Sequence, residues 1–444
     1  MRTTLAAIAL VVLLGGCRSE RADKLGVELA EVALRGDTAA VSHLLARGAD
    51  PSCTAAGGTP LFAAVTKHHV EVVRLLLAHG ARPDAGPRDQ VPCLQVAAMD
   101  GQAEIAAQLA DAGARLDRQD DSGATALDLA LLTRHDGVAK LLLSRGARWS
   151  DLHEAAYFGD AARLKASLGR EQPVDAADRK GFTALGWACR QGQAEAARLL
   201  LDAGASPNPP TTTMTAATPL HLAVLADSLA AAQLLLDRGA RLDAVDGDGY
   251  TPLHCAASGD RLAIARLLVE RGAELSARSN QGRTPLHSAS RRGATRLIRF
   301  LLSRGASVDA RDNQMVTPLY LAAAAGSAEA VQALLAAGAR PDLANSLGAT
   351  PLWAAADAQR MDCVRGLLAA GARPNTKGYG GDTPLHLAVR SKLPEMVRLL
   401  LDHGADRSQR NDAGRTALDE ARRRDLPAVA DLLLQDRRGS QLRR

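Results

Sequence analysis

Apolar and polar residues follow one another along the chain in short helical blocks that recur with a period of 33 residues. Each block opens with Thr-Pro-Leu-His or a variant of it, and from Thr218 to Thr416 the spacing of 33 occurs six times without exception. A fixed period of this length indicates a repeat architecture. The opening positions are Thr59, Pro92, Thr125, Ser150, Thr183, Thr218, Thr251, Thr284, Thr317, Thr350, Thr383 and Thr416, with Val27 in a degenerate first unit.

The block that opens at Thr251 shows which elements one repeat predicts. Thr251 suits the N-cap of a short helix and Pro252 suits its first turn. A second apolar helix over residues 262–270 follows, and Gly272 ends it by supplying the left-handed conformation after the C-terminus. The Gly- and Asp-rich stretch 246–249 predicts a tight hairpin between one unit and the next. Each repeat is therefore expected to be a helix–turn–helix unit followed by a β-hairpin finger.

These blocks, with their Leu-rich second helices and Gly-Ala turns, resemble the ankyrin repeat. The resemblance covers roughly residues 24–436 and implies an all-α repeat solenoid of about thirteen ankyrin-type helix-turn-helix units joined by β-hairpin fingers. No single repeat buries its own apolar face, so stability comes from stacking on neighbours, and the ends need polar caps. Residues 416–435 fit a C-terminal cap. The clearest matches are residues 218–221, 251–254, 284–287 and 383–386.

Composition agrees with thin, closely stacked helices. Hydrophobic residues make up 47% of the chain, but aromatic residues only 2%. A core of Ala, Leu and Val lets helices approach closely. The formal net charge of +5 is small for 444 residues and does not by itself indicate a nucleic-acid partner.

The period is broken in two places. Between Thr125 and Ser150 the spacing falls to 25, which leaves no room for a finger. We expect an N-terminal array of four repeats at 25–149 and a C-terminal array of nine repeats at 150–436, either as a continuous stack lacking one finger or with a bend. The segment 208–214 is two residues longer than standard, and its Pro and Thr content predicts an extended finger.

The two ends of the chain lie outside the repeat pattern. Arg2 and an apolar run are followed by Leu14-Gly15-Gly16-Cys17, which resembles the lipobox of bacterial lipoproteins. We expect residues 1–16 to be a lipoprotein signal peptide, Cys17 to carry lipid and residues 17–24 to be a tether; an ordinary cleaved signal or an uncleaved anchor is the alternative. In that family, a residue other than Asp after the cysteine, here Arg18, favours the outer membrane facing the periplasm over the inner membrane. Residues 437–444 are expected to be a disordered basic tail, with contact to an anionic membrane or polymer as the alternative.

Candidate catalytic and metal-binding chemistry is sparse. His221, His254, His287 and His386 all stand in the fourth place of the helix-opening motif, one repeat apart, which is too far for a shared metal ion. The resemblance implies that this histidine braces the finger by local hydrogen bonds. Cys189, Cys255 and Cys363 occupy helical positions and are expected to be small buried hydrophobic residues. No phosphate-binding loop or nucleophile motif is present, so we expect no enzyme, no cofactor and no metal.

Two groups of residues stand out as candidate partner-binding surfaces, because aromatic and Arg side chains are the usual anchors of protein interfaces. The first has Trp187 nearby and could alternatively fill the gap left by the missing finger; it comprises Tyr157, Phe158, Arg179, Lys180, Phe182 and Arg190. The second would form a basic stripe for carboxylates or phosphates, or else ordinary solvated charge; it comprises Tyr250, Arg278, Gln281, Arg283, Arg291, Arg292 and Arg311, which Tyr379 and Arg390 could extend.

The expected function is that of an envelope-anchored, non-enzymatic protein-binding scaffold that acts through its concave surface. We expect a monomer with a protein partner, which could present an acidic surface, a membrane contact through the N-terminal lipid and no nucleic acid. Two alternatives remain at this stage. The chain could be an immunity or antagonist protein that neutralises a secreted toxin or enzyme, or an accessory protein for envelope stress protection.

Overall fold

The computed structural model describes residues 24–54, 58–86, 92–121, 123–168, 173–210 and 216–434. The expected signal peptide, the lipidation site at Cys17, nearly all of the tether and the basic tail at 437–444 lie outside the described residues, as does most of the extended finger. The chain divides into two compact units, Met1–Ser150 (unit 1) and Asp151–Arg444 (unit 2).

Unit 1 consists of successive helix pairs in which a short first helix is followed by a second helix. The four first helices carry even numbers and the four second helices carry odd numbers. They are α2 (Lys24–Arg35), α3 (Thr38–Ala46), α4 (Pro60–Thr66), α5 (Val70–Ala78), α6 (Cys93–Met99), α7 (Ala103–Asp111), α8 (Ala126–Leu132) and α9 (Asp136–Ser144).

Unit 2 continues the same alternation over a longer stretch, with one additional 3₁₀ turn, η2 (Tyr379–Gly381). Its helices are α10 (Asp151–Phe158), α11 (Ala161–Ser167), α12 (Ala184–Arg190), α13 (Ala194–Asp202), α14 (Pro219–Leu225), α15 (Leu229–Asp237), α16 (Pro252–Ser258), α17 (Leu262–Glu270), α18 (Pro285–Arg292), α19 (Thr295–Ser303), α20 (Pro318–Ala325), α21 (Ala328–Ala336), α22 (Pro351–Asp357), α23 (Met361–Ala369), α24 (Pro384–Arg390), α25 (Pro394–Asp402), α26 (Ala417–Arg423) and α27 (Pro427–Leu434).

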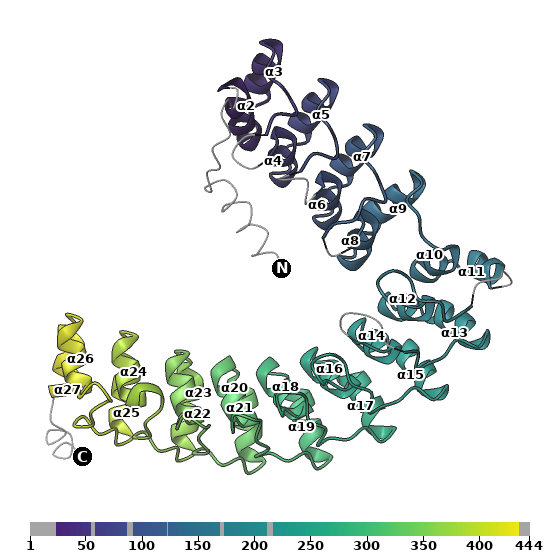
Figure 1. Cartoon of the computed structure of the whole chain (residues 1–444). Coiled ribbons are helices and arrows are strands. Elements are labelled where there is room, and N and C mark those ends of the chain that lie inside the picture. The colour runs from purple at the N-terminus through teal and green to yellow at the C-terminus, as the bar shows by residue number, and fades with distance from the viewer. Residues whose placement is uncertain are drawn as a thin grey trace. The chain divides into compact units, whose positions relative to one another are not determined.

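Within each unit the helices form two rows. First helices pack on first helices, as α16 does on α18, and second helices pack on second helices, as α17 does on α19. In unit 2 the two rows run side by side along a curve, and the first-helix row lies on its inner side (Figure 1). The all-α repeat solenoid predicted from the sequence is thereby confirmed.

The fingers are tight turns rather than the paired strands that the sequence led us to expect. The described residues contain no strand, and one finger shows an isolated bridge between Ala177 and Thr183. In a typical finger, the Asp246 amide donates to the Tyr250 carbonyl at 2.9 Å and the Gly249 amide donates to the Asp246 carbonyl at 2.9 Å. So few residues close a turn but do not extend into a ladder of strand hydrogen bonds.

The helix ends follow the chemistry of the repeated motif. The Thr183 hydroxyl accepts from the Gly186 amide at 3.1 Å, and the Thr317 hydroxyl accepts from the Tyr320 amide at 3.2 Å. These bonds satisfy amides that have no partner inside the helix. At the other end of each pair, a glycine such as Gly272, at φ 93°, takes the left-handed conformation that reverses the chain.

In many of the repeats, one hydrogen bond joins the helix-opening motif to the next repeat. The Nε2 atom of His221 bonds the Tyr250 carbonyl at 2.8 Å, and Nε2 of His254 bonds the Arg283 carbonyl at 2.9 Å. Each pair is separated by 29 residues, so the acceptor lies directly before the next helix opening. We call this contact the cross-repeat brace. It confirms the structural role expected for the fourth-place histidine.

The brace requires a neutral imidazole of defined orientation. The backbone amide of Thr284 donates to Nδ1 of His287 at 3.1 Å, so Nδ1 must be unprotonated and Nε2 carries the hydrogen that the Val316 carbonyl accepts at 3.0 Å. Other side chains make the same bond where histidine is absent: Nε2 of Gln95 donates to the Ala124 carbonyl, and Nε1 of Trp353 donates to the Asp382 carbonyl.

The brace makes the stability of unit 2 depend on pH. Burial lowers the pKa of His254, and it lowers the pKa of His287 to about 4. The unfolded chain binds a proton near pH 6.5 while the folded chain does not, so the stabilisation is complete above that pH and is lost as the pH falls towards 4. For His287 alone the loss is on the order of 3 kcal/mol.

We therefore expect the urea midpoint of the full chain to fall between pH 7 and pH 4.5. A His254→Gln/His287→Gln variant keeps a donor, as Gln95 does, but cannot titrate, and its midpoint should fall less over the same range. Equal losses in the wild type and the variant would show that these histidines do not carry the pH dependence.

Candidate binding surface

The described residues hold little that could support catalysis or metal binding. Among them, no group of three or more His, Cys, Asp or Glu side chains is placed to hold a metal ion. Burial raises the pKa of the Cys93 and Cys255 thiols to about 12, so neither is a thiolate at neutral pH. Cys189 and Cys363 are buried as well. In the part of the chain that the structure covers, no helix has both the length and the apolar character needed to cross a membrane.

The first candidate surface is largely an internal aromatic cluster. Tyr157 is only 1% exposed, and its ring lies 5.4 Å from that of Trp187, which in turn lies 4.6 Å from that of Phe182. Nε1 of Trp187 donates to Asp178 at 2.7 Å. Tyr157 and Phe182 therefore pack within unit 2 and offer little surface to a partner.

The remaining members of this group surround the cluster. Phe158 packs edge-on against Tyr157 at 4.9 Å, and the Arg190 guanidinium lies 5.8 Å from the Trp187 ring centre. Both side chains are half-buried, Arg179 is exposed and Lys180 is half-buried. The polar rim of the cluster is thus the part that a partner can reach.

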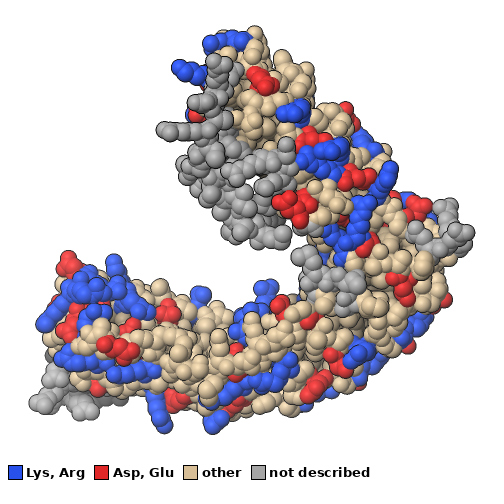
Figure 2. All heavy atoms as spheres, viewed as in Figure 1, with Lys and Arg blue, Asp and Glu red and all other residues tan. Residues whose placement is uncertain are grey.

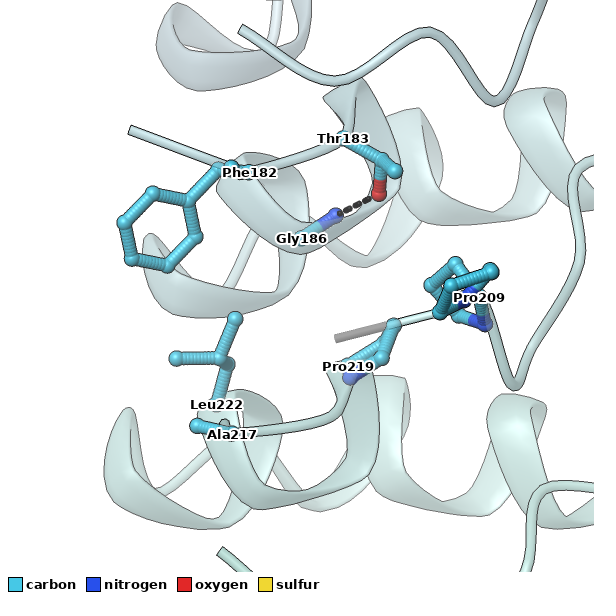
Figure 3. A pocket seen from close by; sticks show the side chains of 9 residues that line it. Phe182, Thr183, Gly186, Pro209, Ala217, Pro219 and Leu222 are labelled. Carbon is cyan, nitrogen blue, oxygen red and sulfur yellow. Dashed lines mark hydrogen bonds between the residues drawn. The ribbon is translucent and has the colours of Figure 1, made fainter. Parts of the chain in front are cut away.

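A small hollow opens beside this cluster, at the repeat whose fourth place is occupied by Gly186. Gly186 has no side chain that could make the cross-repeat brace, and its amide donates to the Thr183 hydroxyl. The hollow lies between α12 and α14, and Figure 3 shows the side chains around it. Its lining is mostly apolar and comprises Gly181, Phe182, Thr183, Gly186, Pro209, Pro210, Ala217, Pro219 and Leu222.

Three arginines of the second candidate surface make contacts within the fold. Arg278 donates to the Arg311 carbonyl at 2.9 Å, and Arg311 donates to the Ala344 carbonyl at 3.2 Å. Arg283 pairs with Asp312 at 3.3 Å, and the Asp312 carboxylate is only 2% exposed. These contacts tie consecutive fingers together.

The other four residues of this group differ in their surroundings. Tyr250 is half-buried and stacks on the His254 ring at a centroid distance of 5.4 Å. Gln281 is exposed at a finger, and its carbonyl accepts from the Asn313 amide. Arg291 and Arg292 are exposed at the end of α18 and have no ion pair or side-chain hydrogen bond with the described residues.

A third surface, on consecutive fingers between α18 and α24, is apolar. Met315 is 42% exposed, Leu347 is 59% exposed and Tyr379 is 42% exposed. We call these three residues the apolar finger tips. Most exposed large hydrophobic residues of a soluble domain are scattered singly, so three on neighbouring repeats point to an interaction site.

Met315 is one of nine described non-glycine residues with a positive φ, and Ala216 stands at the same finger position. Met315 has φ 61°, in the left-handed region, at a finger position where most described repeats carry glycine, as at Gly282 and Gly348. A bulky side chain in this conformation costs roughly 1–2 kcal/mol. The chain therefore keeps an exposed apolar side chain at a position that would be more stable with glycine.

The apolar finger tips rest on a fixed aromatic base. The Tyr379 ring packs edge-on against Trp353 at 4.9 Å, and the Tyr379 hydroxyl accepts from Nδ2 of Asn345 at 3.1 Å. Burial and the neighbouring Tyr379 raise the pKa of Tyr320, which hydrogen-bonds Tyr379 and stays protonated. Arg390 is held by Asp382 at 2.9 Å and by Asp357 at 3.1 Å.

Sequence reasoning missed Met315 and Leu347, and named Tyr379 only as a possible extension of the second candidate surface. A signal was present, because Tyr320 and Trp353 replace the fourth-place histidine in two consecutive repeats. Met315 likewise replaces the glycine of its finger. Elsewhere, acidic and basic side chains are interspersed over the face that Figure 2 shows, as expected for a small net charge.

Comparison with known families matches almost the whole described chain to ankyrin repeats. The model for three ankyrin-repeat copies matches residues 29–120, 82–151, 152–246, 239–312 and 311–378, and the model for many copies matches residues 367–421.

Curated relatives match parts of the chain. Rat cyclin-dependent kinase 4 inhibitor B is 36% identical over 115 residues, which are 26% of this chain and 88% of the relative. Human ankyrin repeat and SOCS box protein 16 is 37% identical over 223 residues, which are 50% of this chain and 45% of the relative. Human transient receptor potential cation channel subfamily A member 1 is 26% identical over 201 residues; the match covers 43% of this chain but only 15% of the channel.

A substitution at Gly186 tests the packing described around this residue. A Cβ atom there would lie 3.5 Å from the Thr183 hydroxyl oxygen and 3.6 Å from the nearest Leu222 carbon, both ordinary contacts. Gly186→Ala should therefore raise the free energy of unfolding by about 1 kcal/mol through helix propensity. As a control, Gly272→Ala should lower it, because φ is 93° there. Urea unfolding measures both; a loss of stability in Gly186→Ala would contradict the packing described.

Proposed function

Because the chain belongs to the ankyrin-repeat family, we propose that it is a non-enzymatic protein-binding scaffold that uses the finger and first-helix face of unit 2. Repeats of this kind present an extended surface whose residues can vary without changing the fold. The described residues offer no metal cluster, and burial raises the pKa of the Cys93 and Cys255 thiols. The surface features described above instead suit contact with another protein.

The observation that carries this proposal is Met315. A bulky apolar residue occupies a strained, exposed finger tip, and Leu347 and Tyr379 expose apolar surface on the next two fingers. Local strain of this kind is retained where it serves a site. The contacts of Tyr379 with Trp353, Asn345 and Tyr320 fix its orientation, so a partner would bind without much ordering of this surface.

We further propose that the scaffold is held in the cell envelope by lipid on Cys17 and faces the periplasm. The support is the run Leu14-Gly15-Gly16-Cys17, which resembles a lipobox, and Arg18 after it, which favours the outer membrane. Stable anchoring requires more than one acyl chain.

A second candidate is an antagonist that binds and neutralises one specific target. The name of cyclin-dependent kinase 4 inhibitor B shows that an ankyrin-repeat relative, matched over 88% of its length, acts as an inhibitor of another protein. An antagonist holds one partner tightly, whereas a general scaffold binds several partners weakly. The number of partners recovered, and their dissociation rates, separate the two.

The binding surface is tested by affinity capture from solubilised envelopes. A Met315→Gly/Leu347→Ser variant should recover the specific partner at least about tenfold less well than the wild type, because two apolar anchors are lost. Its unfolding free energy should not fall, since glycine relieves the strain at position 315.

A Leu229→Ser variant serves as the control. Leu229 begins the second helix α15 and is 45% exposed, so this variant also removes exposed apolar surface, but away from the proposed face. The control should recover the partner as the wild type does. Equal recovery by the finger-tip variant and the wild type would show that the apolar finger tips are not the binding surface.

The anchor is tested by labelling cells with palmitate. Label should enter the wild-type chain and be absent from Cys17→Ala, because the thiol is the attachment point. Label that persists in Cys17→Ala would rule out lipidation at this residue.

A further inference from the structure

One repeat of unit 2 departs from the others in charge. Residues 285–304, which contain α18 and α19, carry Arg291, Arg292, Arg296, Arg299 and Arg304 and no Asp or Glu. Like charges this close repel one another, and helix neighbours three or four residues apart destabilise a helix by a few tenths of a kcal/mol per pair. The repeat keeps this arrangement although the chain as a whole has a nearly balanced charge.

Four of these arginines gather around the turn between the two helices. Arg291 and Arg292 end α18, and Gly293, at φ 74°, reverses the chain. Arg296 is the second residue of α19, and Arg299 follows three residues later on the same side of that helix. We call Arg291, Arg292, Arg296 and Arg299 the arginine turn. Arg304 is separate, since its guanidinium lies over the Phe300 ring at the other end of α19.

Arg296 reverses the sign of charge found at the same place in other repeats. The second residue of α13 is Glu195, that of α21 is Glu329 and that of α25 is Glu395. An acidic residue is favourable there, because the N-terminus of a helix carries a partial positive charge. A cation at this place is unfavourable in the free protein and becomes favourable when an anion approaches.

The arginine turn has no internal counter-charge. Arg291, Arg292, Arg296 and Arg299 are all exposed, and none has an ion pair or a side-chain hydrogen bond with the described residues. Several other exposed arginines of unit 2 are paired with carboxylates of neighbouring repeats, as Arg271 is with Asp237 at 2.9 Å and Arg238 with Asp202 at 2.8 Å. In the adjoining repeats, neither Asp260 nor Glu329 pairs with these arginines.

We infer that the arginine turn binds an acidic segment of a partner polypeptide, one with several neighbouring Asp or Glu side chains. Guanidinium groups bind carboxylates through paired, charge-assisted hydrogen bonds, and four groups around one turn match a short run of carboxylates. A polypeptide suits this surface better than a membrane, because no exposed large hydrophobic side chain lies within residues 285–304 to enter a bilayer. The inference rests on the proposed function and names a second contact region, separate from the apolar finger tips.

The test uses the full chain and a defined probe, a fluorescent peptide of six glutamates, with a peptide of six glutamines beside it. The wild type should bind the glutamate peptide and not the glutamine peptide. Affinity should fall steeply between 0.01 and 1 M salt, because the Debye length shrinks from about 30 Å to about 3 Å. An Arg292→Glu/Arg296→Glu variant should bind the glutamate peptide at least about tenfold more weakly.

The control is Arg365→Glu/Arg398→Glu, which makes the same change in charge at two other exposed arginines without ion pairs on the second-helix row. It should retain most of the affinity. The Arg292→Glu/Arg296→Glu variant should also keep a thermal midpoint close to that of the wild type, since the favourable acid at the α19 N-terminus offsets the unfavourable acid at the α18 C-terminus. Weaker binding in this variant therefore cannot come from unfolding.

Two outcomes would overturn the inference. One is an equal loss of affinity in both variants, which would mean that net charge alone attracts the peptide. The other is binding of the wild type to vesicles rich in anionic phospholipid, but not to the glutamate peptide, which would make the arginine turn a membrane contact. Neither outcome affects the finger-tip capture experiment, so the two proposals can fail separately.

Discussion

The cross-repeat brace is the interaction that holds most of the fingers of unit 2 in place. A helix–turn–helix unit of about thirty residues has too little core to fix its own connecting finger, so the finger must be held from outside. The fourth-place side chain does this from within a capped helix, donating to the carbonyl that lies 29 residues later. The donor is buried, and the acceptor directly precedes the next helix. One bond therefore fixes both the conformation of the finger and the position at which the following repeat begins. A buried carbonyl without its partner would cost about 1–3 kcal/mol.

The fold could be predicted from the sequence because the same local signals recur in one repeat after another. A helix cap at Thr251, a first-turn proline at Pro252 and a left-handed turn at Gly272 have counterparts in other repeats. The 33-residue period indicates that neighbouring repeats stack. The fingers were predicted less well: Gly and Asp indicated a reversal, but not that Asp246 to Tyr250 would close as a turn without strands. A turn is determined by the few residues that form it, whereas the pairing of two strands also depends on how long the strands are.

The binding surface could be predicted only in part, because exposure and pairing are three-dimensional. Arg278, Arg283 and Arg311 have the same residue type as Arg292, yet their partners are carbonyls and a carboxylate one repeat away. Tyr157 and Phe182 are aromatic residues of the kind that anchor interfaces, but both are buried in the core of unit 2. The informative positions were those where one repeat departs from the others: Gly186 lacks the donor, Met315 replaces glycine, and Arg296 replaces an acid. Each of these departures lowers the stability of its own repeat. For that reason each one points to a binding site.

The central claim is that the brace orders the finger that follows it in the chain. Amide hydrogen exchange in His254→Ala tests this most directly. The variant removes the donor to the Arg283 carbonyl, so the amides of residues 279–283 should exchange at least about tenfold faster than in the wild type. The finger at residues 345–349, which does not receive this bond, should be unchanged. Unchanged exchange at residues 279–283, or an equal increase at both fingers, would contradict the claim.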